Sequence, residues 1–118
     1  MTKPQATAVV TGGAGFIGSH MVDLLLARGF RVRVIDNLVG GRATNLAQHA
    51  SNPDFTFEQS DIRDYRAGNP LFADADYVFH FAGIGDIVPS IETPDIYMST
   101  NVQGTVQMLE CARHAGVK

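Results

Sequence analysis

The sequence predicts an α/β protein with a parallel sheet, because short apolar runs alternate with longer amphipathic stretches. The first run, Ala6 to Thr11, is rich in β-branched residues and ends in two glycines, which is typical of a buried strand. Gly15 to Arg28 then has apolar residues at helical spacing, and Gly29 stands where that helix would end. Strands separated by helices imply βαβ units, whose crossovers are right-handed in nearly all proteins.

Three further strands and a long helix continue this alternation. The strands are expected at Arg31 to Asp36, Phe55 to Glu58 and Asp76 to Phe81, and the helix at Asp95 to Ala115 with Gly116 as its stop. The expected strand order is 3-2-1-4, a partial, Rossmann-type doubly wound sheet. Such a sheet leaves one flank bare where a fifth strand would pair, so we interpret the chain as a fragment.

The connections are expected to be mostly irregular. Thr44 is expected to cap a short helix that runs to His49. Asp61 to Phe72 is predicted to be irregular or briefly helical, and Ala82 to Pro94, with two glycines and two prolines, to be a long loop. The apolar positions of the two main helices are Ile17, Met21, Leu24, Leu25 and Ala27 in the first, and Ile96, Met98, Val102, Val106, Leu109 and Ala112 in the second.

The composition is that of one ordinary globular domain. The chain has 118 residues, of which 45% are hydrophobic and 18% charged, with a formal net charge of −3. This balance gives no basic surface for nucleic acid, and no apolar run is long enough to span a membrane. The start of the chain lacks a signal-peptide pattern and a single cysteine, Cys111, cannot form an internal disulfide, so we expect a cytoplasmic protein.

Three glycines form the most informative motif. Gly12, Gly15 and Gly18 give the pattern G-x-x-G-x-x-G between the first strand and the first helix. In a dinucleotide-binding loop the first glycine allows a sharp turn, the second lets backbone approach a pyrophosphate, and the third lets the helix pack on the sheet. The alternative is a glycine-rich turn that binds nothing, but the preceding strand, the following helix and the acid that ends the next strand favour a dinucleotide.

Asp36 is that acid, 18 residues after Gly18. A carboxylate at this place accepts hydrogen bonds from the adenosine ribose hydroxyls and repels the extra phosphate of NADP, so the predicted cofactor is NAD. Two alternatives stay open. Asp36 could only cap the turn at Asn37 and Leu38, and Arg42 could swing toward the ribose and tolerate a 2′-phosphate.

Five segments in order, TGGAGFIGSH, VIDNL, DIRD, HFAG and TNVQGT, resemble the extended short-chain dehydrogenase/reductase family. Within it the chain is most similar to the NAD-dependent epimerases and dehydratases, such as UDP-glucose 4-epimerases and nucleotide-sugar dehydratases. The resemblance covers nearly the whole chain and implies a tightly held NAD. It implies that backbone at Phe16 and Ile17 meets the pyrophosphate, and that the ribose is lined by Asp36, Asn37 and Leu38, beside the 39–41 turn.

The resemblance also assigns the adenine. Asp61 and Ile62 would hold its edge, with the Asp61 carboxylate accepting a hydrogen bond from the exocyclic amine. The alternative is that Asp61 only pairs with Arg63 or Arg66.

The end of the fourth strand and the long helix complete the implied site. Phe81, Ala82 and Gly83 would lie beneath the ribose and pyrophosphate, and Thr100 near the cofactor, with Asn101 beside it as a structural polar residue. Ligands of open α/β sheets bind at the carboxyl ends of the strands, where most of these residues are expected. The alternative for Thr100 is a hydroxyl that bonds back to its own helix carbonyls.

We predict no catalytic residue within the chain. The family's proton chemistry uses a tyrosine and a lysine in Y-x-x-x-K. The three tyrosines, Tyr65, Tyr77 and Tyr97, are followed four residues later by Asn69, Phe81 and Asn101. The tyrosines are therefore interpreted as surface or core residues.

One position departs from the epimerase pattern. UDP-galactose 4-epimerases usually have a lysine two residues after HFAG, where this chain has Gly85 followed by Asp86. The departure favours a relative that acts on another nucleotide sugar.

No metal site or hydrolase triad is predicted. His80 lies in the fourth expected strand and is interpreted as a core histidine with satisfied hydrogen bonds, and Cys111 as a small core residue. Ser90 has no paired histidine and acid nearby in sequence. The other histidines, which have no ligand cluster at metal spacing, are His20, His49 and His114.

These observations support three hypotheses. The first is the NAD-binding portion of a nucleotide-sugar epimerase or dehydratase, with a nucleotide sugar as substrate and a homodimer as the assembly of the full-length protein. The second is a sensor module that binds the dinucleotide without turnover. The third is a folding domain with weak or no affinity for NAD.

Overall fold

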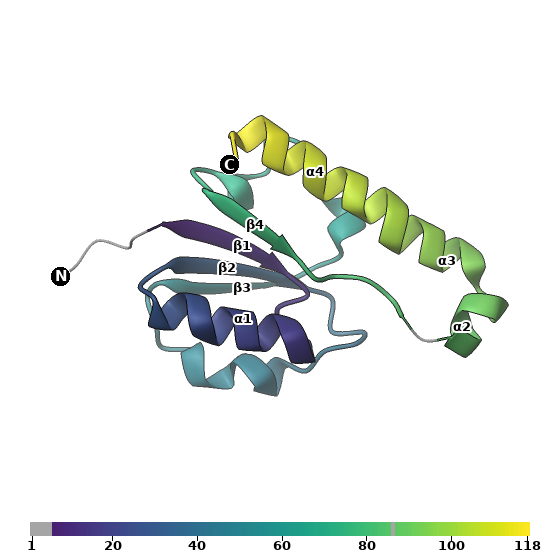
Figure 1. Cartoon of the computed structure of the whole chain (residues 1–118), viewed down its shortest axis with the longest axis horizontal. Coiled ribbons are helices and arrows are strands. Elements are labelled where there is room, and N and C mark those ends of the chain that lie inside the picture. Colours follow the sequence, from purple (N-terminus) through teal and green to yellow (C-terminus); the bar gives the residue numbers. More distant parts are fainter. Residues whose placement is uncertain (1–5, 86) are drawn as a thin grey trace.

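A four-stranded parallel sheet forms the centre of the protein, whose computed structural model describes residues 6–85 and 87–118 (Figure 1). Its strands lie in the order β3-β2-β1-β4, which confirms the predicted fold class and strand order. The expected bounds are confirmed to within one residue. The observed strands are β1 (Thr7–Thr11), β2 (Arg31–Asp36), β3 (Phe55–Gln59) and β4 (Tyr77–His80).

One face of the sheet is covered by α1 (Phe16–Ala27) and the 3₁₀ helix η1 (Ala43–His49) (Figure 1). Successive strand residues point to opposite faces, so alternate residues of β1 and β2 pack here. The buried cluster of this face contains Ala8, Val10, Ala14, Val22, Leu25, Val32, Val34 and Leu46.

The opposite face is covered by α4 (Gly104–Ala115) and two short 3₁₀ helices, η2 (Ile62–Asp64) and η3 (Pro70–Phe72). Val9 packs on this side, between Ala8 and Val10 on the other, as the two-residue period of a strand requires. The buried cluster of this face contains Val9, Ile35, Ile62, Tyr65, Phe72, Ala75, Met108 and Cys111. The prediction of Cys111 as a core residue is confirmed.

The predicted long helix is present, with an interruption that its periodicity did not indicate. It consists of α3 (Pro94–Met98), a π-helical turn η4 (Ser99–Gln103) and α4. Gly116 ends it at φ 76°, a conformation that glycine adopts easily, so the predicted stop is confirmed.

Two loop predictions were wrong. Residues 87–92 of the predicted loop from Ala82 to Pro94 form a short helix, α2 (Ile87–Glu92), whereas Asp86 lies outside the described residues. Thr44 lies inside η1 rather than at its start, and Arg42 precedes that helix without a side-chain cap. η1 is instead attached to α1, because the Asp23 carboxylate accepts from the side chains of Gln48 and His49.

The buried faces of the two main helices differ from their apolar positions. In α1, Ile17 is 65% exposed and Leu24 48% exposed. The buried positions are Gly18, Ser19, Val22 and Leu25 in α1, and Thr100, Gly104, Met108 and Cys111 in the long helix. The second helix exposes five apolar side chains, namely Ile96, Met98, Val102, Val106 and Leu109. Gly18 packs against Gly12 and Gly104 against Ile62, where a larger side chain would not fit. Of the predicted apolar positions in α1, Leu25 is buried and Met21 packs on the core, so the periodicity identified this face only in part.

No helix among the described residues is both long and apolar enough to cross a membrane.

Replacing Gly18 with alanine should destabilise the fold. A Cβ at Gly18 would lie 2.1 Å from the Gly12 carbonyl oxygen, so either the helix or the loop would have to move. We expect Gly18→Ala to lower the free energy of unfolding by about 2 kcal/mol or more in urea denaturation. Gly40→Ala is the matched control, because a Cβ there meets no atom within 4 Å. The clash argument fails if both variants unfold at the same urea concentration.

Candidate functional site

A cavity of about 360 Å³ opens at the carboxyl ends of the strands. Parallel strands that lead to helices on opposite faces leave a crevice at this edge, where ligands of such folds bind. The lining residues come from the end of β2, from the segments that follow all four strands and from the π turn. They are Gly12, Gly15, Ile35, Asp36, Asn37, Val39, Gly40, Gly41, Ser60, Asp61, Ile62, Phe81, Ala82, Gly83, Ile84, Gly85 and Thr100.

The glycine-rich loop makes the sharp bend that its pattern predicts. Gly12 has φ 70°, and its amide donates to the Ile35 carbonyl at 2.8 Å. Its backbone lies so close to β4 that a Cβ would come within 2.7 Å of the Ala82 nitrogen. Gly12 and Gly15 line the cavity, whereas Gly18 lies beneath the loop and holds α1 against it.

Phe16 and Ile17 form the start of α1 but do not line the cavity with their side chains. The Phe16 side chain is 80% exposed and that of Ile17 65% exposed. Their backbone N–H groups lie in the first turn of the helix, where N–H groups have no acceptor within the helix. These amides and the helix dipole leave a partial positive charge beside the glycine-rich loop.

Asp36 ends β2 and is only 8% exposed. Its Oδ2 accepts from the Ala14 amide at 2.9 Å and its Oδ1 from the Leu38 amide at 2.7 Å. The carboxylate therefore caps the turn after β2, as the alternative interpretation proposed, and also lines the cavity. Leu38 has φ 66° and packs against the core on the α1 side instead of lining the cavity.

The Ala14 carbonyl is held from the loop after β2, a contact that sequence reasoning missed. It accepts from the Arg42 amide at 3.0 Å and from Asn45 Nδ2 at 2.8 Å. Arg42 is exposed and does not line the cavity. An asparagine in a helix has no sequence signature that would reveal a partner 31 residues away.

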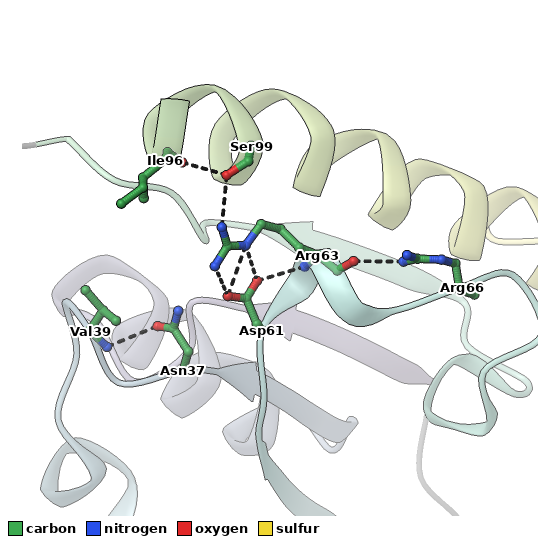
Figure 2. A network of polar contacts seen from close by, with 7 residues as sticks. All are labelled: Asn37, Val39, Asp61, Arg63, Arg66, Ile96 and Ser99. Carbon is green, nitrogen blue, oxygen red and sulfur yellow. Dashed lines mark hydrogen bonds and ion pairs between the residues drawn. The ribbon is translucent and has the colours of Figure 1, made fainter. Parts of the chain in front are cut away.

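Asp61 pairs with Arg63, as the alternative interpretation proposed, and lines the cavity as well (Figure 2). Arg63 Nη2 lies 2.6 Å from Asp61 Oδ2, and the Arg63 amide donates to Oδ1 at 2.9 Å. These donors, with a further hydrogen bond from Asn37, hold the pKa of Asp61 below its ordinary value. Arg66 bonds instead to the carbonyls of Arg63 and Tyr65.

Ser60 and Ile62, on either side of Asp61, also line the cavity. Ile62 is buried, and the Ser60 hydroxyl lies 2.5 Å from the Tyr65 hydroxyl. Tyr65 is a core residue, as predicted, and burial raises its pKa to about 12. A phenol of that pKa stays protonated at neutral pH, so it does not serve as a general base.

The end of β4 and the π turn form the other side of the cavity, where Phe81, Ala82, Gly83 and Thr100 all lie. Thr100 is 7% exposed, and no hydrogen bond joins its hydroxyl to another described residue, so the back-bonding alternative is not observed. Asn101 is a structural polar residue, as predicted. Its side chain bonds to both the amide and the carbonyl of Ile84, at 2.8 and 2.9 Å.

Both ring nitrogens of His80 form hydrogen bonds, as predicted, although the residue is half-buried and belongs to neither core cluster. Nδ1 lies 2.6 Å from the Thr11 hydroxyl and Nε2 lies 2.9 Å from the Thr105 hydroxyl. Within residues 6–85 and 87–118 no three His, Cys, Asp or Glu side chains are grouped so that they could hold a metal ion.

Comparisons with known proteins agree with this geometry. Residues 8–118 match the family model described as the NAD dependent epimerase/dehydratase family. The chain is 41% identical over 110 residues to UDP-glucuronic acid decarboxylase 2 of Arabidopsis thaliana, covering 93% of this chain and 24% of that protein. It is 35% identical over 118 residues to a UDP-glucose 4-epimerase of Schizosaccharomyces pombe, covering 97% and 33% of the two chains.

A solved structure gives the same result. The dTDP-glucose 4,6-dehydratase of Streptomyces venezuelae, solved with NAD bound, superposes with a TM-score of 0.84 at 41% identity, over 94% of this chain and 37% of that one. The chain thus spans about a quarter to a third of the length of the curated relatives it matches.

The loss of stability caused by removing the Asp61–Arg63 pair should depend on pH. The pKa of Asp61 is depressed in the folded state, so its stabilising contribution is present above the unfolded pKa and is lost as the pH falls through the folded value. We expect Asp61→Asn to be less stable than wild type at pH 7 and the difference to shrink toward pH 3, as measured by urea denaturation. A difference independent of pH would show that the pair does not stabilise the ionised carboxylate.

Proposed function

Because the chain belongs to the NAD dependent epimerase/dehydratase family, we propose that residues 1–118 form the NAD-binding Rossmann domain portion of a nucleotide-sugar epimerase or dehydratase. One observation carries this proposal. A single cavity is lined by Gly12 and Gly15 of the glycine-rich bend and by the Asp36 carboxylate. A diphosphate and a sugar diol are the two groups that this pair of features recognises together.

The pyrophosphate would lie against the first turn of α1. The N–H groups of Phe16 and Ile17 would donate to its oxygens, and Gly15 lets backbone approach without a Cβ. The side chains of Phe16 and Ile17 take no part, which is consistent with their exposure.

The adenosine half would lie between the loops after β2 and β3. Each Asp36 oxygen already accepts one backbone amide and keeps lone-pair capacity for a ribose hydroxyl. Its negative charge disfavours a 2′-phosphate, and Arg42 is not positioned to neutralise one. Asn37 would line the ribose beside Asp36, and Asp61 and Ile62 would line the adenine, with Asp61 kept ionised and oriented by Arg63. Leu38 would shape this turn from the core side.

The other half of the dinucleotide would lie over Phe81, Ala82 and Gly83, facing Thr100. When bound, NAD supplies the hydride acceptor for a sugar carbon. The residues of this chain would bind and orient it, and the proton transfer would be performed by residues outside the chain. The relatives act on UDP- or dTDP-linked sugars by name, so we propose a nucleotide sugar as substrate of the longer protein.

We also propose a cytoplasmic location and a homodimer of the longer protein, without nucleic-acid or membrane partners. The single cysteine supports the cytoplasmic location, and the net charge of −3 supports the lack of nucleic-acid or membrane partners. The five exposed apolar side chains along α3, η4 and α4 support the homodimer, because a second copy would cover them.

Cofactor preference tests the role of Asp36. We expect the chain to bind NAD more tightly than NADP in calorimetric titration, and Asp36→Ala to weaken NAD about tenfold or more, because two charge-assisted hydrogen bonds are lost. The preference over NADP should narrow in this variant. Asp54→Ala is the control, because Asp54 pairs only loosely with Arg31, at 3.9 Å. Equal affinities of wild type for NAD and NADP would refute the assignment of Asp36.

Turnover by a longer protein that contains this chain tests the rest of the proposal. NMR of UDP- and dTDP-sugars incubated with that protein should reveal an epimerised, dehydrated or decarboxylated product. Binding of NAD without conversion of any sugar would support the sensor module instead.

A further inference from the structure

Five groups form a continuous hydrogen-bond network beside the cavity, from the end of β4 to the π turn. The Ala82 amide donates to the Thr11 hydroxyl at 3.1 Å, and that hydroxyl lies 2.6 Å from His80 Nδ1. His80 Nε2 lies 2.9 Å from the Thr105 hydroxyl, which donates to the Asn101 carbonyl at 2.6 Å. This hydrogen-bond network therefore connects β1, β4 and the long helix.

Proton counting fixes the direction of every bond. The Asn101 carbonyl can only accept, so the Thr105 hydroxyl donates its one proton to it. The same hydroxyl oxygen must therefore accept from His80 Nε2–H. In a neutral ring Nδ1 then accepts, and Thr11 supplies the proton. Burial lowers the pKa of His80, which favours this neutral ring. A protonated ring would instead donate from Nδ1 to the second lone pair of the Thr11 oxygen, and the direction of that bond would reverse.

The residues at the two ends of this hydrogen-bond network lie in or next to the segments that line one side of the cavity. Ala82 is its first donor, and Gly12 directly follows Thr11. Asn101 is its last acceptor, follows Thr100 in the π turn, and binds the Ile84 backbone with its side chain. Loss of the imidazole would remove the link between the end of β4 and the helix, and would leave the Asn101–Ile84 hydrogen bonds as the connection between them at the cavity wall.

We propose that His80 is a positioning residue for the dinucleotide. Its neutral Nε2–H tautomer joins the ends of β1 and β4 to the π turn and so fixes the cavity side formed by Ala82, Ile84 and Thr100. The proposal rests on the proposed binding of NAD, and it adds a residue that does not line the cavity and acts through its neighbours.

Thr105→Val tests the hydrogen bond between His80 and Thr105 without removing the imidazole ring. Valine has nearly the shape of threonine but neither accepts from Nε2–H nor donates to Asn101. We expect NAD affinity to fall about tenfold, the effect of one lost hydrogen bond with a partner left unsatisfied, and Thr105→Ser to restore it. His80→Phe should weaken NAD binding at least as much, but Thr105→Val is the decisive variant because it preserves the imidazole ring.

Thr93→Val is the matched control. The Thr93 hydroxyl bonds to the carbonyl four residues earlier, at 2.9 Å, as the Thr105 hydroxyl does, but it lies away from His80. Urea denaturation of each variant separates stability from binding. A merely structural role for the link would lower the stability of Thr105→Val and leave the NAD dissociation constant of the folded chain unchanged.

Nitrogen-15 NMR of the imidazole gives the second measurement. Without NAD, wild type should show a protonated Nε2 and an unprotonated Nδ1, and Thr105→Val should shift the Nε2 signal. An Nδ1–H tautomer in wild type, or equal NAD affinity of wild type and Thr105→Val, overturns the positioning role alone. A wild-type chain that binds no NAD overturns the proposed function and this role together.

Discussion

The hydrogen bond from the Ala14 amide to the buried Asp36 carboxylate is the contact on which the site depends, because it attaches the glycine-rich loop to the end of β2. A buried charge is costly unless polar groups satisfy it, and the amides of Ala14 and Leu38 both donate to this one. The Ala14 carbonyl is held in turn by Arg42 and Asn45. Both peptide groups of Ala14 are thus fixed before any ligand arrives, which reduces the ordering that binding would require.

The position of the cavity follows from where the strands part. β1 leads through Gly12 into α1 on one face, whereas β4 leads through Ala82 toward the long helix on the other (Figure 1). At the point of divergence the two backbones touch so closely that only glycine fits at position 12. The crevice therefore includes this tight backbone contact, and the residues at the ends of β2 and β3 line it as well.

Features with a local cause could be predicted from the sequence, and features that depend on partners far along the chain could not. Short apolar runs separated by helical stretches predicted all four strands, and the glycine spacing predicted the bend at Gly12. The buried helix faces were predicted only in part, because Gly18 packs on the glycine-rich loop and Gly104 on Ile62 through their small size and not through hydrophobicity. The contacts of Asn45 and His80 required the fold itself, since their partners lie 31 and up to 69 residues away.

The π turn is explained by the three different tasks of its consecutive residues. Ser99 accepts from Arg63 Nη1 at 2.9 Å, Thr100 faces the cavity, and Asn101 holds Ile84 (Figure 2 shows the first contact). A π turn locally changes the rotation between successive side chains, and such turns often occur at functional sites. Met108 and Cys111 hold α4 in the core, whereas Ile96, Met98 and Val102 of α3 and the π turn are exposed. Around the π turn, hydrophobic burial therefore gives little preference for one rotation over another. A change in the polar contacts of Ser99 and Asn101 would move Thr100 relative to the cavity.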